Sequence, residues 1–174
     1  MNRKTQLTSL FLHAILLTVV YVFQGMVFPY VRLNGFVPLL LPIAATGVAI
    51  YEGRYTGGFF GIFAGILCDV SFNEPAGVFT VMLTLSGLLI GTLADTIITR
   101  GFVMFIASCV VVLALSAFVQ LLPLFFTGAV PLAPLVSTGI QQTVYSLIFT
   151  IPIWFFVRAL GERANRISSS GRQL

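Results

Sequence analysis

Charge is what this sequence has least of. Only 8% of its 174 residues are charged, whereas a soluble domain is about a quarter charged. So few charged side chains leave too little polar surface to cover a globule in water. Because 58% of the residues are hydrophobic and the mean hydropathy is +1.05, the sequence indicates an integral membrane protein surrounded by the lipid bilayer.

Residues that commonly carry chemistry are also scarce. His13 is the single histidine, and no Gly-x-Ser-x-Gly motif accompanies it. Asp69 is expected near the outer face of the membrane and Asp95 near the inner end of the fourth helix, so they cannot form a catalytic pair. Cys68 and Cys109 lie in separate hydrophobic segments without metal-ligand or disulfide spacing, which indicates small buried residues. We therefore expect no catalytic residue, no metal and no cofactor, and the singly scattered basic residues do not indicate nucleic-acid binding.

Hydrophobic segments separated by charged residues, glycine or proline predict an all-α integral membrane protein in which one domain carries six transmembrane helices. We expect these helices at about residues 7–28, 35–50, 55–70, 78–98, 101–126 and 135–157, with a basic tail at 158–174. The second and third helices are expected to be short.

Basic residues predict the orientation of these helices. With six crossings, Arg32 alone lies on one side of the membrane, and the other basic residues lie on the side of both termini. Loops rich in Lys and Arg stay in the cytoplasm. We therefore expect a multi-pass protein of the bacterial cytoplasmic (inner) membrane with both termini in the cytoplasm.

A stripe of glycines is the most distinctive pattern of the third and fourth segments. Within lipid, helices associate through close packing that small residues permit. The stripe predicts a groove for tight helix packing, and this groove accepts either a helix of the same chain or the transmembrane helix of a partner. Its members are Gly57, Gly58, Gly61 and Gly65 in the third segment and Gly87 and Gly91 in the fourth.

Asp69 continues the four-residue spacing of the stripe and ends it on a carboxylate. A carboxylate within a span is costly and usually faces protein or water. Two interpretations stay open: Asp69 caps the turn that leads to Gly77, or it takes part in binding a partner and fixing the outer loop.

Prolines and glutamines mark further positions within the spans. Pro38 and Pro42 in the second helix and Pro152 in the sixth predict kinked helices. The glutamines could line an outward-facing pocket for a small solute together with Asp69, but we favour hydrogen bonds between helices. These glutamines are Gln24, Gln120, Gln141 and Gln142.

The segments "VPLLLPIAATG", "TGGFFGIFAGILCD" and "EPAGVFTVMLTLSGLLIG" resemble the rod shape-determining protein MreD family. The matching residues are Gly58, Gly61, Gly65, Asp69 and Gly77. The resemblance implies a non-enzymatic scaffold subunit of the bacterial cell-elongation machinery that supports peptidoglycan synthesis. Its implied partner is an MreC-like bitopic membrane protein, which connects it to an MreB-like filament, a RodA-type glycosyltransferase and a class B penicillin-binding protein.

The same family implies a fold similar to the substrate-binding subunits of energy-coupling-factor transporters. The alternative function is therefore that of a vitamin-binding subunit of such a transporter. Those subunits usually carry an Ala-x-x-x-Ala motif on the first helix, and "LFLHAILLTVVYVFQG" has none. We therefore prefer the scaffold.

Overall fold

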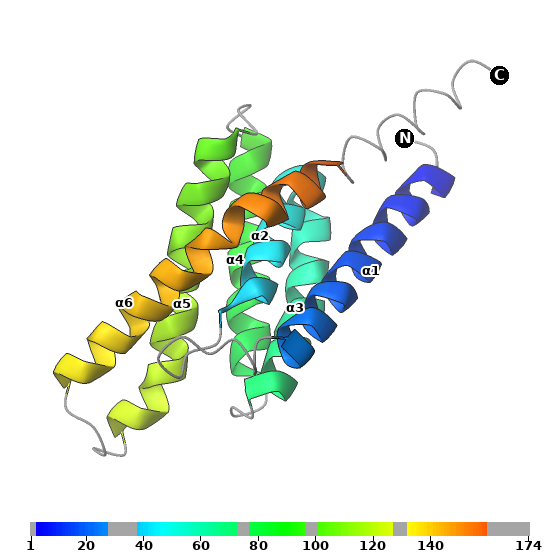
Figure 1. The fold of residues 1–174 in the computed structure, drawn as a ribbon. Coiled ribbons are helices and arrows are strands. Elements are labelled where there is room, and N and C mark those ends of the chain that lie inside the picture. The colour runs from blue at the N-terminus through cyan, green and yellow to red at the C-terminus, as the bar shows by residue number, and fades with distance from the viewer. Residues whose placement is uncertain (1–2, 28–37, 73–76, 97–100, 127–131, 160–174) are drawn as a thin grey trace.

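The computed structural model describes residues 3–27, 38–72, 77–96, 101–126 and 132–159, and within these ranges the chain is helical (Figure 1). The helices are α1 (Arg3–Val27), α2 (Leu40–Glu52), α3 (Arg54–Phe72), α4 (Val78–Thr96), α5 (Phe102–Phe126) and α6 (Leu132–Ile148). A further helical segment, Thr150–Ala159, continues α6 after a bend. The predicted all-α class is confirmed.

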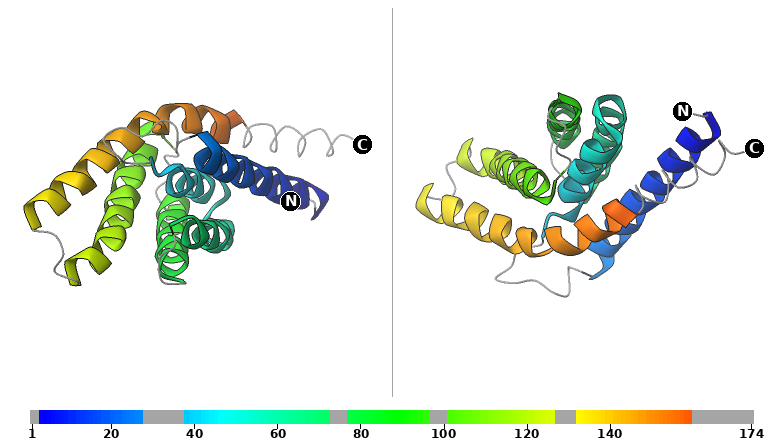
Figure 2. Two further views of the ribbon diagram at one scale, coloured as in Figure 1. Left: turned by 60° about the horizontal axis from the view of Figure 1, so that its bottom comes forward. Right: turned by 90° about the horizontal axis from the view of Figure 1, so that it is seen from above.

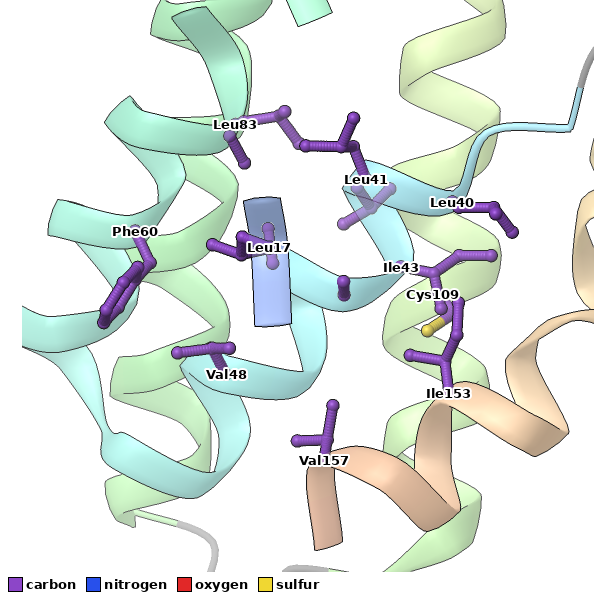
Figure 3. Packing of buried hydrophobic residues seen from close by; sticks show 14 of the residues in the cluster. Leu17, Leu40, Leu41, Ile43, Val48, Phe60, Leu83, Cys109, Ile153 and Val157 are labelled. Atoms are coloured by element: carbon purple, nitrogen blue, oxygen red, sulfur yellow. The ribbon is translucent and has the colours of Figure 1, made fainter. Parts of the chain in front are cut away.

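The centre of the molecule is α2. Its sequence has no polar face, and such a helix is stable only when it is surrounded. Every residue from Leu40 to Ile50 is buried, and α2 packs against α1, α3, α4 and α5. Figure 3 shows the core around α2, with side chains from neighbouring helices that include Leu17, Phe60, Leu83, Cys109, Ile153 and Val157.

The length of α2 sets it apart from its neighbours. With 13 residues it is about 20 Å long, whereas the hydrocarbon core of a bilayer is about 30 Å thick. The expectation of a short second helix is thus met. The third helix, however, is not short, because α3 has 19 residues.

Neither Pro38 nor Pro42 interrupts α2, so the expectation of a kink in this helix is wrong. Pro38 precedes the helix and Pro42 lies in its first turn. A first-turn amide has no carbonyl partner within the helix, so proline costs nothing there. The Thr46 hydroxyl donates to the Pro42 carbonyl at 2.8 Å.

The sixth hydrophobic segment forms two helices rather than one. Residues Val136–Ile148 and Thr150–Ala159 meet at 43°, three residues before Pro152. The second part is anchored in the core, because the Trp154 ring packs at a tilt against Phe105 and Tyr51, with 4.9 Å and 5.5 Å between ring centroids. Figure 2 shows the bend from two further directions.

Two of the described helices, Val78–Thr96 and Phe102–Gln120, are long and apolar enough to cross a membrane, and the bent α6 pair adds a third. The outward faces of the bundle are apolar as well, with exposed side chains such as Phe59, Leu89 and Phe118. These features are typical of a membrane protein. Six crossings remain a prediction.

Candidate functional site

The glycine stripe lies in the contact between α3 and α4, which run antiparallel. A Cβ built on Gly61 would lie 2.5 Å from the Leu83 carbonyl oxygen, and one on Gly57 would lie 2.9 Å from the Gly87 carbonyl oxygen. One on Gly91 would lie 2.6 Å from the Arg54 Cα. Any side chain at these positions would push the two helices apart, so the glycines set the separation of α3 and α4.

The other members of the stripe complete the same contact. A Cβ on Gly65 would collide with the backbone of Thr80, and one on Gly58 would lie 2.6 Å from Leu88 Cδ2. Gly57 also faces α2, where the Ala49 Cβ would lie 2.7 Å away. The groove predicted from the spacing is therefore filled by helices of the same chain, and these glycines leave no open channel for a partner helix.

Asp69 caps the first turn of α4. Its carboxylate accepts hydrogen bonds from the backbone amides of Gly77 (3.0 Å), Phe79 (2.9 Å) and Thr80 (3.2 Å). It also accepts one from the Thr80 hydroxyl at 2.6 Å. The first amides of a helix have no intrahelical acceptor, and a negative charge near them is favourable. Gly77 adopts a φ of 99° there, a conformation that suits glycine.

Asp95 repeats this arrangement at the opposite end of the pair, which the sequence interpretation missed. Its carboxylate accepts a hydrogen bond from the Arg54 amide at 3.2 Å, and it lies against Gly53, whose φ is 85°. Each helix therefore ends in an aspartate that caps the start of the other. A repeated Gly-x-x-x-Asp spacing, Gly65–Asp69 and Gly91–Asp95, is the signal that could have revealed it.

A second polar arrangement holds the N-terminus of α2. The Gln24 side-chain oxygen accepts hydrogen bonds from the amides of Leu40 (3.0 Å) and Leu41 (3.1 Å). The Ser146 hydroxyl oxygen accepts one from the Leu39 amide at 3.0 Å. Side chains of α1 and α6 thus supply the acceptors that a buried helix start needs.

The contact that the structure gives Gln120 and Gln142 joins two helices. Gln142 donates to the Gln120 side-chain oxygen at 3.3 Å, which is a contact between α6 and α5. Gln141 is exposed, and the Asp69 carboxylate is occupied by α4. The favoured interpretation, hydrogen bonding between helices, describes Gln24, Gln120 and Gln142.

The other end of α2 is joined to α1 through His13. His13 is fully buried, and its Nδ1 lies 3.6 Å from a Glu52 carboxylate oxygen. Together with Gln24, this contact attaches α1 to both ends of α2. Among the described residues, no three His, Cys, Asp or Glu side chains are grouped as metal ligands.

The comparison with known families decides what this glycine- and aspartate-bearing bundle is. The family model of the rod shape-determining protein MreD matches residues 2–163. The chain belongs to the MreD family. No curated protein and no solved structure matches the chain. The family match covers every helix described above, and MreD membership links the whole bundle to rod-shape determination.

Proposed function

We propose that the chain is a non-enzymatic scaffold subunit of the cell-elongation machinery, which binds an MreC-like membrane protein and thereby supports peptidoglycan synthesis. The observation that carries this proposal is the MreD family match along residues 2–163. Through this partner the scaffold would be connected to an MreB-like filament, a RodA-type glycosyltransferase and a class B penicillin-binding protein.

The partner-binding surface belongs to this proposal. The α3–α4 pair is joined by its glycine contact and by an aspartate cap at each end, so it is suited to hold a surface in a fixed shape. Its outer face carries exposed apolar side chains, among them Ile62 and Leu89. We propose that a transmembrane helix of the partner packs on this outer face rather than within the glycine contact.

Co-purification from membranes tests the proposal. The tagged full-length chain should capture the MreC-like protein, and depletion of the chain should turn rod-shaped cells into spheres. Ile62→Trp and Leu89→Trp should reduce capture because they add bulk to the outer face without reaching the glycine contact. Val111→Trp, at an exposed position of α5, is the matched control and should capture normally.

Other results would contradict the proposal. If cells depleted of the chain stayed rod-shaped, the chain would have no role in cell elongation. Normal capture by both tryptophan variants would show that the partner binds another surface of the protein. Thermal stabilisation by a vitamin-like solute, together with capture of an ATPase module, would favour the transporter subunit instead.

A further inference from the structure

The bend in α6 leaves one buried hydroxyl without a hydrogen-bond partner. Thr150 is 2% exposed, and its Oγ1 has no partner among the described residues. Other threonines of this bundle donate their hydroxyl to the carbonyl four residues earlier. They are Thr18, Thr46, Thr84, Thr92, Thr96 and Thr143.

The bend changes the helix at the carbonyl that Thr150 would use. The carbonyl four residues before Thr150 is that of Ser146, which accepts the Phe149 amide at 3.1 Å. This is a tightened turn that interrupts the regular helix. Pro152 promotes the interruption, because it has no amide proton and its ring collides with the carbonyl of Ile148.

The bent form has a hydrogen bond outside the helix that offsets the unpaired Thr150 hydroxyl. In the bent form, Ser146 Oγ accepts the Leu39 amide at 3.0 Å. Ser146 belongs to the part before the bend, whereas Thr150 begins the part that Ile153, Trp154 and Val157 anchor in the core. A change of bend therefore moves Ser146 relative to α2 and leaves Thr150 near its place.

We propose that α6 is a hinge with two positions about Phe149. The bent form makes the Ser146–Leu39 hydrogen bond and leaves the Thr150 hydroxyl unpaired. The straighter form returns a helical carbonyl to Thr150 and gives up the Ser146–Leu39 bond. Each form satisfies one buried polar group at the expense of the other, so the two hydrogen bonds offset each other in the balance between the forms. This inference is independent of the proposed scaffold function.

Geometry shows that the two positions are distinguishable. Halving the bend would move Ser146 by about 2 Å and Ile140 by about 5 Å, given a rise of about 1.5 Å per residue. The first movement exceeds what a hydrogen bond tolerates. The second lies within the resolution of distances between spin labels.

Spin labels on the full-length protein in lipid nanodiscs test the hinge. One label is placed at Ile140→Cys on α6 and one at Leu89→Cys on α4, both exposed positions, with Cys68 and Cys109 replaced by alanine. The expected result is two populations of label distances, one of which matches the structure. A pair at Ile62→Cys and Leu89→Cys, within the α3–α4 pair, should give one population.

Two substitutions should shift the populations in opposite directions. Thr150→Val removes the hydroxyl and should favour the bent form, and Ser146→Ala should favour the straighter form, each by about fivefold in the population ratio. Thr143→Val, whose hydroxyl bonds to Gly139 within the first part of α6, should leave the ratio unchanged. A single population in the unaltered α6, or a shift in the same direction from both substitutions, would overturn the hinge.

Discussion

Individual side chains supply hydrogen bonds at helix starts that the backbone cannot complete. Asp69 accepts three amides and one hydroxyl at the start of α4, and Gln24 accepts two amides at the start of α2. An unpaired amide costs more in an apolar surrounding than in water. These two residues should therefore contribute more to stability than caps on the surface of soluble proteins.

Asp69→Asn should destabilise the fold by about 1–3 kcal/mol, because an amide nitrogen replaces one accepting oxygen and faces other donors. Equilibrium unfolding in detergent measures the change. Ser71→Ala is the matched control, since the Ser71 hydroxyl donates to the Leu67 carbonyl within α3, and this variant should differ little from the parent. Equal stability of Asp69→Asn and the parent would show that the carboxylate does not secure α4.

Gln24→Leu should be at least as harmful, because it leaves the Leu40 and Leu41 amides without an acceptor inside the bundle; a cost of about 2–4 kcal/mol is expected for two such groups. Gln24→Glu keeps an accepting oxygen and should recover part of the loss. Gln141→Leu, at an exposed position of α6, serves as the neutral comparison. The same unfolding assay would contradict the cap if Gln24→Leu matched Gln141→Leu.

The contact between α3 and α4 shows how much of the helix packing could be predicted from the sequence. The four-residue spacing of Gly57, Gly61 and Gly65 predicted a close helix contact, and the described helices follow the hydrophobic segments of the chain. Spacing alone did not identify the helix that fills the contact, because a glycine face accepts any apolar neighbour. That choice depends on the short α3–α4 connection and on the two aspartate caps, of which only the possible role of Asp69 was foreseen.

Glycines at two positions should respond to alanine with opposite signs. Gly61→Ala would place a Cβ 2.5 Å from the Leu83 carbonyl oxygen and should cost about 1–3 kcal/mol through overpacking. Gly25 lies inside α1, and beyond its own stretch of helix no atom of the described residues comes within 4 Å of a built Cβ. Gly25→Ala should therefore stabilise the protein by up to about 1 kcal/mol, since alanine is the better helix former.

The free energy of unfolding of both alanine variants, measured in detergent, separates the effect of helix packing at Gly61 from the effect of helix propensity at Gly25. If Gly61→Ala were as stable as the parent, the contact between α3 and α4 would be looser than the structure indicates. If Gly25→Ala were destabilising, another molecule or lipid would contact α1 closely at this position.

In the whole molecule, α2 is the element that the other helices surround. The sequence predicted a short hydrophobic second helix at about residues 35–50, but it did not predict that the other helices surround it, because every span of a membrane protein is apolar. Nor did the sequence indicate that Gln24 and Ser146 accept hydrogen bonds from the amides at the start of α2. Gln24 is 16 positions from Leu40 and Ser146 is 107 positions from Leu39, and only the complete fold brings them together. Through the Ser146–Leu39 hydrogen bond, a change in the α6 bend would affect α2 at the centre of the bundle.

Successive helices of the molecule run in alternating directions, and this bears on the predicted orientation. Tyr51 contacts Trp154, so the positively charged Arg54 and Arg158 lie towards the same end of the bundle. Asp69 and Gly77 mark the opposite end. If positive residues stay in the cytoplasm, the Arg54 end faces the cytoplasm and the Asp69 end faces outwards.

Thiol labelling of cysteine substitutions in membrane vesicles measures this orientation. Val78→Cys lies at the Asp69 end and Tyr55→Cys at the Arg54 end, and both positions are exposed. A membrane-impermeant reagent should label Val78→Cys in right-side-out vesicles and Tyr55→Cys in inverted ones. The parent should stay unlabelled in both because Cys68 and Cys109 are buried. The reverse pattern would invert the topology, and it would place the basic end of the bundle outside the cell, away from the filament to which the proposed scaffold is connected.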